Sequence, residues 1–169
     1  MTWEGAVAVM IGTAALIVVL AGIAWWRRTR RDAGLRAPVG ELPDTAVIVG
    51  RFTALYVATT VHDQPLERLA IGGLGFRSRA DVTVTDAGVA VDLTGKPRIF
   101  FPVARITDVA QATVAIDRVV EKDGLVRLSW RLDDDTIVDS YLRPQDVSSR
   151  VLADAIAGIS HPTQTGSDT

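Results

Sequence analysis

The feature that most constrains this chain is a run of 22 residues without a charged side chain, from Gly5 to Trp26. A helix of that length rises about 1.5 Å per residue and spans roughly 30 Å, the thickness of the hydrocarbon core of a bilayer. A single span in lipid has to be a helix, because only then does the backbone satisfy its own hydrogen bonds. Trp3, Trp25 and Trp26 mark the two ends, where indole rings favour the interface. Residues 1–26 are therefore expected to form a transmembrane anchor.

A cleaved signal peptide is the main alternative for this segment. Such a peptide begins with basic residues and has an apolar core of roughly 7–15 residues. Here the first five residues, MTWEG, carry an acid and no basic side chain, and the apolar core is longer. Ala21–Ala24 resembles a small-residue cleavage site, but cleavage there would leave two tryptophans and two arginines at the new N-terminus. These features favour an uncleaved anchor.

Arginines directly follow the apolar run, at Arg27, Arg28, Arg30 and Arg31. Basic residues close to a span stay on the cytoplasmic side. We therefore expect a single-pass protein of the plasma membrane, with its N-terminus outside and the rest of the chain in the cytoplasm. The same arginines are candidates for contact with anionic lipid headgroups, worth about 1 kcal/mol each near the surface. The simpler interpretation is that they only set the topology.

Charge and composition narrow the function classes. Residues before Gly40 hold five arginines against two acids, a balance of +3, so the total of −2 leaves −5 for the remainder. An acidic domain is a poor candidate for nonspecific nucleic-acid binding, and we expect no nucleic-acid partner. The chain has no cysteine, which excludes disulfides, thiolate metal sites and cysteine nucleophiles. No cofactor is expected.

Glycine and proline divide the chain after the arginines. Gly34, Pro38, Gly40 and Pro43 predict a basic juxtamembrane segment and linker over residues 27–45. A domain is then expected over residues 46–160, and the polar residues 161–169 are expected to be a disordered tail.

The sequence of the domain predicts short strands followed by one helix. The strands are expected over residues 47–61, 80–93 (a hairpin turning at 86–88), 98–109, 112–120, 125–132 and 136–143, with turns at 121–124 and 133–135. Pro102 places the 98–109 strand at an edge or a bulge. The helix is expected over residues 144–159, with Pro144 as its first residue. About seven antiparallel strands of this kind form a small barrel or sandwich, here capped by the C-terminal helix.

The segments VTVTDAGVAVDL, RIFFPVARITDVAQA and KDGLVRLSWRLDDDTIVDSYLR, with the terminal helix, carry a resemblance. Over residues 47–159 the chain resembles the pleckstrin-homology (PH) superfold, and more closely the bacterial PH-like domains. With its membrane helix it is also similar to small actinobacterial membrane proteins. The resemblance implies a mainly-β PH-like domain. Eukaryotic members bind phosphoinositides through a basic first hairpin, but residues 51–79 mix four arginines with acids and hold no Lys-x-Arg cluster.

Two groups of polar residues invite a chemical interpretation. His62 and Asp63 have the residue types of a general base and its orienting carboxylate, although a polar turn at a strand end explains them more simply. Asp133, Asp134 and Asp135 lack the glycine and distant glutamate of a calcium-binding loop, which favours a solvated hairpin turn. We expect no catalytic residue, no metal site and no enzymatic activity.

The most suggestive stretch is IGGLGFRSRAD, residues 71–81. Its glycines match neither the P-loop nor the dinucleotide-binding pattern, so a mobile interstrand loop that covers the barrel is the simpler interpretation. The functional interpretation is a contact with a protein partner or a lipid headgroup through Phe76, Arg77 and Arg79, an aromatic ring flanked by guanidinium groups.

Together these features predict a non-enzymatic, single-pass membrane protein that presents a PH-like interaction or scaffolding domain to a protein partner at the cytoplasmic face. One alternative is recognition of an anionic lipid or a phosphorylated ligand by the glycine-rich loop. Another is an accessory subunit of a membrane transport or export complex, which would need partners because one helix cannot form a transport path.

Overall fold

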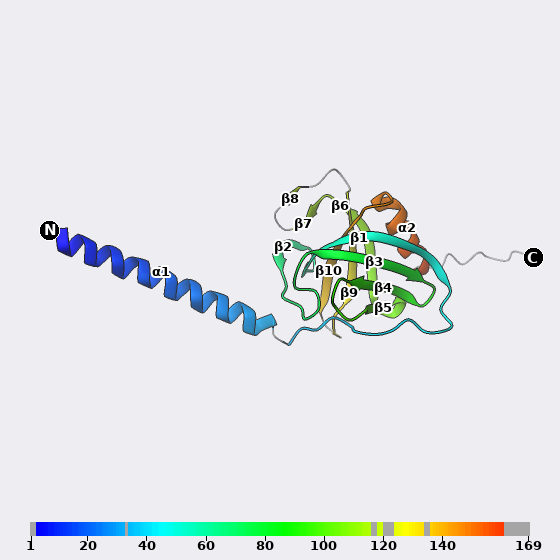
Figure 1. Cartoon of the computed structure of the whole chain (residues 1–169), viewed down its shortest axis with the longest axis horizontal. Coiled ribbons are helices and arrows are strands. Elements are labelled where there is room, and N and C mark those ends of the chain that lie inside the picture. Colours follow the sequence, from blue (N-terminus) through cyan, green and yellow to red (C-terminus); the bar gives the residue numbers. More distant parts are fainter. Residues whose placement is uncertain (1–2, 33, 116–117, 120–123, 134–135, 161–169) are drawn as a thin grey trace, which may run out of the picture. The chain divides into compact units, whose positions relative to one another are not determined.

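The computed structural model describes residues 3–32, 34–115, 118–119, 124–133 and 136–160. The chain divides into two compact units, residues 1–34 and 35–169. The first unit is helix α1, Trp3–Asp32 (Figure 1). Within it the segment Val9–Arg27 is long and apolar enough to cross a membrane, by length and composition. The helix continues through the arginine cluster, so residues 27–32 extend α1 and are not part of a linker.

The second unit is mainly β. Its elements are β1 (Ile48–Val61), β2 (Gln64–Arg68), β3 (Ser78–Thr85), β4 (Gly88–Leu93), β5 (Ile99–Pro102), the short 3-10 helix η1 (Val103–Arg105), β6 (Ile106–Ala112), β7 (Val114–Ala115), β8 (Arg118–Val119), β9 (Leu125–Arg131), β10 (Ile137–Pro144) and helix α2 (Ser149–Ser160). Eight strands form one antiparallel sheet in the order β5-β4-β3-β1-β10-β9-β6, with β2 on β1. Strands β7 and β8 form a separate pair, so the single strand expected over residues 112–120 is wrong.

Strand β1 gives the sheet its sandwich form. Its first half, Ile48–Tyr56, pairs with β3, and its second half, Ala54–Val61, pairs with β10. The register shifts between Tyr56 and Ala58, and such irregularities bend a strand. One long strand therefore passes from one layer to the other. The expected antiparallel fold with a capping helix is confirmed as a sandwich; the end strands β5 and β6 do not pair with each other, so the barrel is not closed.

The strand expected over residues 98–109 is two strands. Strand β5 ends at Pro102, η1 follows, and β6 begins at Ile106. Proline has no N–H to donate to a ladder, which ends the pairing at this point. The two strands then run to opposite ends of the sheet order. The expectation that Pro102 marks a sheet edge is confirmed, because β5 is a terminal strand.

The segment before β1 lies along the domain. Backbone bonds join Gly72 to Leu35 (2.9 Å) and Ala37 to Gly72 (3.1 Å), and Ala37 is buried. Further along, Gly40 donates to the carbonyl of Arg98 at 3.2 Å, and Phe100 donates to Pro38 at 2.9 Å. These bonds cover the β5 edge of the sheet. Residues 35–40, expected as linker, therefore belong to the compact unit.

Helix α2 packs on the sheet through Leu152, Ala153 and Ile156, all buried. It begins five residues later than expected. Pro144 is the last residue of β10, and the following turn is bound to β1, because Thr53 donates to the Asp146 carboxylate at 3.0 Å. The Ser148 hydroxyl then accepts from the N–H of Val151 at 3.4 Å, as a helix cap does. The expected tail, residues 161–169, lies outside the described residues.

Candidate functional site

Two polar regions flank strand β2. The first is the two-residue turn between β1 and β2, formed by His62 and Asp63. Asp63 adopts a left-handed backbone conformation with φ of 58°, which aspartate tolerates in turns. The polar turn that the sequence favoured is therefore confirmed.

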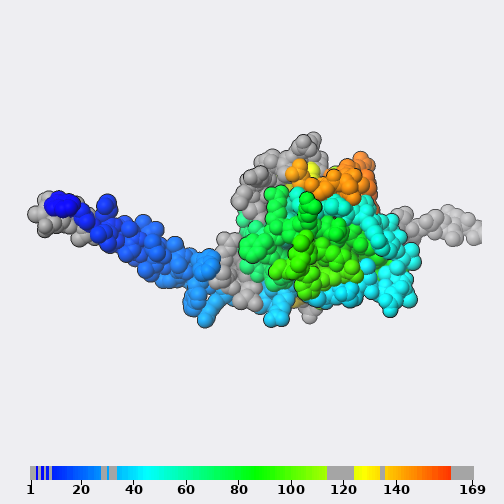
Figure 2. Space-filling model, viewed as in Figure 1, coloured from blue at the N-terminus to red at the C-terminus, as the bar shows by residue number. Residues whose placement is uncertain are grey.

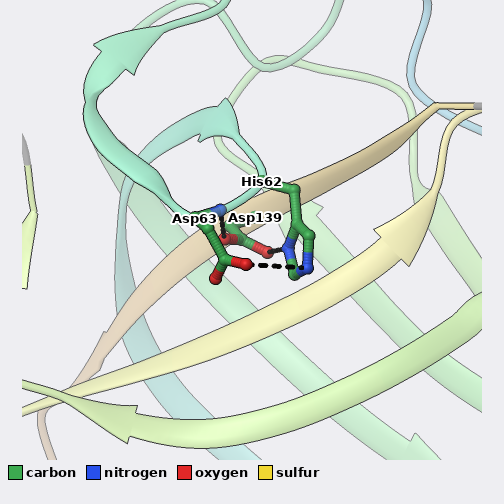
Figure 3. Close-up of side chains that lie close together, drawn as sticks. All are labelled: His62, Asp63 and Asp139. Atoms are coloured by element: carbon green, nitrogen blue, oxygen red, sulfur yellow. Dashed lines mark hydrogen bonds and ion pairs between the residues drawn. The ribbon is translucent and has the colours of Figure 1, made fainter.

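Sequence reasoning missed the partner of this turn, which is Asp139 on β10. The Asp139 side chain is completely buried, and its carboxylate accepts from three donors, two of which, His62 and Asp63, are drawn in Figure 3. His62 Nδ1 lies 2.9 Å from Oδ1, the hydroxyl of Ser129 donates to the same oxygen at 2.6 Å, and the backbone N–H of Asp63 donates to Oδ2 at 3.1 Å. Because a carboxylate only accepts, Nδ1 carries the ring proton. A buried carboxylate with this many donors is a satisfied group.

The second carboxylate of the turn is paired as well. Asp63 lies 3.5 Å from His62 Nε2 and 3.4 Å from the guanidinium of Arg127, which also donates to Asp108 at 2.9 Å. Burial alone would lower the pKa of Arg127, but the hydrogen bond to Asp108 and the nearby charges of Asp139 and Asp108 raise it above its usual value. A cation already neutralises this cluster.

His62, Asp63 and Asp139 offer ligand atoms within 4.8 Å of one another, a spacing that a metal ion could use. Both oxygens of Asp139 are already hydrogen-bonded, which leaves only His62 Nε2 and Asp63 to ligate, beside the charge of Arg127. Structural metal sites ordinarily supply four ligands. The contacts therefore fit a polar network that fixes the β1–β2 turn on β10 better than a metal centre.

The second region is the glycine-rich stretch between β2 and β3. Its first half is held in the domain: Ile71 and Leu74 are buried, and the Tyr56 hydroxyl donates to the Leu74 carbonyl at 2.8 Å. Burial raises the pKa of Tyr56 to about 12, against a partial lowering by its hydrogen bond to Thr59. The expectation of a loop that only covers the core fits this half alone.

The second half of the stretch projects into solvent. Phe76 is 84% exposed, and the exposed guanidinium groups of Arg77 and Arg79 make no hydrogen bond or ion pair to any residue that the structure describes. On the neighbouring strand β2, Leu66 is 70% exposed, and Arg68 donates to the Gly75 carbonyl at 2.7 Å. Of the three residues predicted as a contact site, Phe76 and Arg77 lie on this loop, and Arg79 follows as the second residue of β3.

A cleft of about 460 Å³ lies elsewhere on the domain, over the outer side of β1, β3 and β4. Figure 2 looks onto β3 and β4, drawn in green, beside the cyan residues that precede and begin β1. Arg51 and Arg98 line the cleft together with Asp81 and Asp92. Arg98 is held by Asp92 (2.8 Å) and Glu41 (3.0 Å), and the hydrogen bond to Asp92 chiefly raises its pKa. The mixed charges favour no single class of ligand.

The predicted juxtamembrane arginines lie on the last turns of α1. Arg27 is exposed, and the Arg30 guanidinium lies 4.3 Å from the ring centre of Trp26, a cation–π geometry. The side chains of Arg28 and Arg31 lie outside the described part of the chain.

The two edges of the sheet differ. Residues 37–40 cover β5, whereas no described strand pairs with the outer side of β6. Helix α2 lies beside β6, and Gln111 on the strand donates to the hydroxyl of Ser149 on the helix at 2.9 Å. Val151 on the same helix is half exposed.

Comparison with known proteins agrees with this architecture. The family model described as "Bacterial PH domain-like" matches residues 35–156. The chain belongs to this bacterial PH-like family. The match begins at the residue where the compact unit begins. Among solved structures, the chain is similar to the C-terminal phosphotyrosine interaction domain of mouse APBB2, with 12% identity, a TM-score of 0.49, and coverage of 75% of this chain and 96% of that one. No curated protein matches.

Proposed function

We propose that this protein is a non-enzymatic, single-pass membrane protein that presents its PH-like domain to a protein partner at the cytoplasmic face. The uncharged run in α1 supports the membrane span, and the arginines that follow it support the orientation, with the N-terminus outside. The bacterial PH-like family membership supports an interaction domain.

The edge of β6, with which no strand of the described residues pairs on its outer side, is the observation that carries the interaction role. An edge strand presents unpaired backbone N–H and C=O groups, and soluble proteins usually protect such edges with lysine, proline or a covering segment. Strand β6, ITDVAQA, has seven residues, one charge and no proline or lysine. The same domain covers its other edge with residues 37–40. An extended segment of a partner added to β6 would complete the ladder and lie beside α2.

A non-enzymatic role is consistent with the polar clusters. The histidine and the carboxylates at the β1–β2 turn are bound to one another, to Ser129 and to Arg127. General acid–base catalysis needs a group that reaches a substrate in the right protonation state. Nδ1 of His62 is hydrogen-bonded to the buried carboxylate of Asp139, and Nε2 faces the carboxylate of Asp63.

The test places a photoreactive residue at Gln111, which is exposed on β6, in the full-length protein in its own membrane. We expect a discrete protein adduct that disappears when Val151→Asp puts a charge on the exposed face of α2, the helix that packs against β6. The matched control is Val47→Asp, a similarly exposed valine before β1, which should leave the adduct in place. An adduct that survives Val151→Asp, or no adduct from Gln111, would contradict the edge as the interaction surface.

A further inference from the structure

The glycine-rich loop is joined to the point where the chain enters the domain. Leu35 is the first residue of the domain unit, and the carbonyl of Leu35 accepts from the Gly72 N–H at 2.9 Å. Only Ala33 and Gly34 separate Leu35 from the end of α1 at Asp32. Within the segment 27–45 that the sequence suggested as juxtamembrane segment and linker, residues 27–32 are helical and residues 35–40 are bound to the domain.

Covalent reach then limits how far this loop can lie from the bilayer. If the hydrocarbon ends near Trp26, the helical residues up to Asp32 rise about 9 Å beyond it, at about 1.5 Å per residue. Three more extended residues add at most about 10 Å, which keeps Leu35 within roughly 20 Å of the hydrocarbon. The headgroup region fills the first 5–7 Å or so of that distance. Phe76 follows Gly72 by four residues, so it lies within reach of the interface.

The surface around the loop is also the basic part of an acidic domain. Residues 35–40 and 64–80 contain four arginines, at Arg36, Arg68, Arg77 and Arg79, and one acid, Glu67, a local balance of +3. Residues 40–169 as a whole carry 13 basic and 18 acidic side chains. Of the flanking acids, Asp63 is paired with Arg127, and Asp81 lines the cleft on the outer side of the sheet. This surface therefore keeps a net positive charge within an acidic domain, even when Asp81, two residues after Arg79 on β3, is counted with it.

We propose that Phe76, Leu66, Arg77 and Arg79 form a membrane-docking surface that rests on the anionic cytoplasmic leaflet. Phe76 and Leu66 enter the interface between headgroups and acyl chains, where aromatic and aliphatic side chains are stabilised. The guanidinium groups of Arg77 and Arg79 bind lipid phosphates. The tether holds this surface at an effective concentration on the order of millimolar, so weak individual contacts are sufficient. This inference rests on the proposed membrane anchor and adds a second contact that fixes the orientation of the domain.

The test uses the full-length protein in nanodiscs and exploits the absence of cysteine. Gly75→Cys places a label next to Phe76, and a side chain at Gly75 meets open space. A polarity-sensitive fluorophore at this position reports burial in lipid, through its emission and its quenching by iodide. A label at Arg150→Cys is the positional control, because this exposed residue is on α2, which Figure 1 shows apart from β2.

In discs containing phosphatidylglycerol, we expect a blue-shifted Gly75→Cys label and a several-fold drop in iodide quenching. Discs of phosphatidylcholine alone should give a water-like label. The variant Phe76→Ser with Arg77→Ala and Arg79→Ala should restore the water-like signal. A matched variant that removes equal charge elsewhere, Val47→Ser with Arg105→Ala and Arg131→Ala, should not, since all three residues are exposed and belong neither to the loop nor to β2.

The outcomes separate this surface from the anchor. A water-like label in anionic discs, with the protein stably incorporated, would overturn the docking surface and leave the anchor intact. A protein that does not incorporate into discs would overturn the proposed anchor, and the docking surface with it. A label equally shielded in both lipid compositions would contradict the role of anionic headgroups.

Discussion

The turn at His62 and the loop at Phe76 lie at the two ends of β2 and differ in whether their polar side chains have hydrogen-bond partners. In the turn, His62, Asp63 and Asp139 bond to one another and to neighbouring side chains. At the loop and the start of β3, the guanidinium groups of Arg77 and Arg79 are exposed without a partner among the described residues. Clustered side chains whose hydrogen bonds are satisfied hold a fold together, whereas exposed aromatic and cationic groups without partners are available to another surface.

The largest expected effect tests the turn. Asp139→Ala removes a buried carboxylate and leaves Ser129, His62 and the Asp63 N–H without their acceptor. Losing one member of a buried charged network costs roughly 3–5 kcal/mol of unfolding free energy. Urea unfolding measures this cost. The control is Asp92→Ala, which breaks a partly exposed pair with Arg98 and should cost about 1 kcal/mol or less. Equal costs would contradict the structural role of the turn.

The next effect concerns the buried half of the loop and depends on pH. Tyr56 has a pKa of about 12 in the folded protein, where it is buried, against 10.0 for an unburied tyrosine in the unfolded chain. Below pH 10 both states keep the proton, and the full stability is present. As the pH rises from 10 to 12 the unfolded chain loses its proton first, so roughly 2–3 kcal/mol of stability is lost. Chemical unfolding across this range should show the loss.

Tyr56→Phe serves as the control for that pH dependence and has an effect of its own. The variant should lose less stability between pH 10 and 12, although Tyr141, whose pKa is also raised by burial, still contributes. At neutral pH it removes the hydroxyl that donates to Leu74, which should cost about 1 kcal/mol. Hydrogen exchange should then accelerate in residues 71–79. Unchanged exchange there would mean that Tyr56 does not hold the loop.

The smallest effect on stability belongs to the exposed half. Phe76→Ser with Arg77→Ala and Arg79→Ala should change the unfolding free energy by less than about 0.5 kcal/mol each, because these side chains make no buried contact. Differential scanning calorimetry of wild type and variant provides the measurement. A loss comparable with that of Asp139→Ala would show that the loop supports the fold, and would remove the contrast between the two regions.

Much of the fold could be predicted from the sequence, where local signals were strong. β-branched and aromatic residues identified β1, alternation of apolar and polar residues identified the β3–β4 hairpin, and Asp86 with Gly88 marked its turn. The start of the helix was predicted five residues too early, because a proline such as Pro144 suits the end of a strand as well as the start of a helix. The hydrogen bond from Thr53 to Asp146 instead holds the residues after Pro144 in a turn against β1. Glycine and proline likewise suggested a linker over residues 35–40, where long-range backbone bonds form.

Of the two candidate sites, the one around Phe76 could be predicted from the sequence, whereas the cluster around Asp139 could not. Phe76, Arg77 and Arg79 are close in sequence, so predicting that they lie close together required no tertiary information. Asp139 is 77 residues from His62, and only the pairing of β1 with β10 brings the two together. One signal was present: a carboxylate inside the apolar strand TIVDSYLR must find donors when it is buried. Nothing in the sequence alone named His62 and Ser129 as those donors.

The orientation of the chain is the claim on which both proposed surfaces depend. Single cysteines at Thr2 and at Arg150 can be labelled in intact cells with a maleimide that does not cross membranes, since the chain has no other cysteine. The account predicts that Thr2→Cys reacts in intact cells and that Arg150→Cys reacts only after lysis. Labelling of Arg150→Cys in intact cells would place the domain outside, and neither the β6 edge nor the Phe76 loop could then act at the cytoplasmic face.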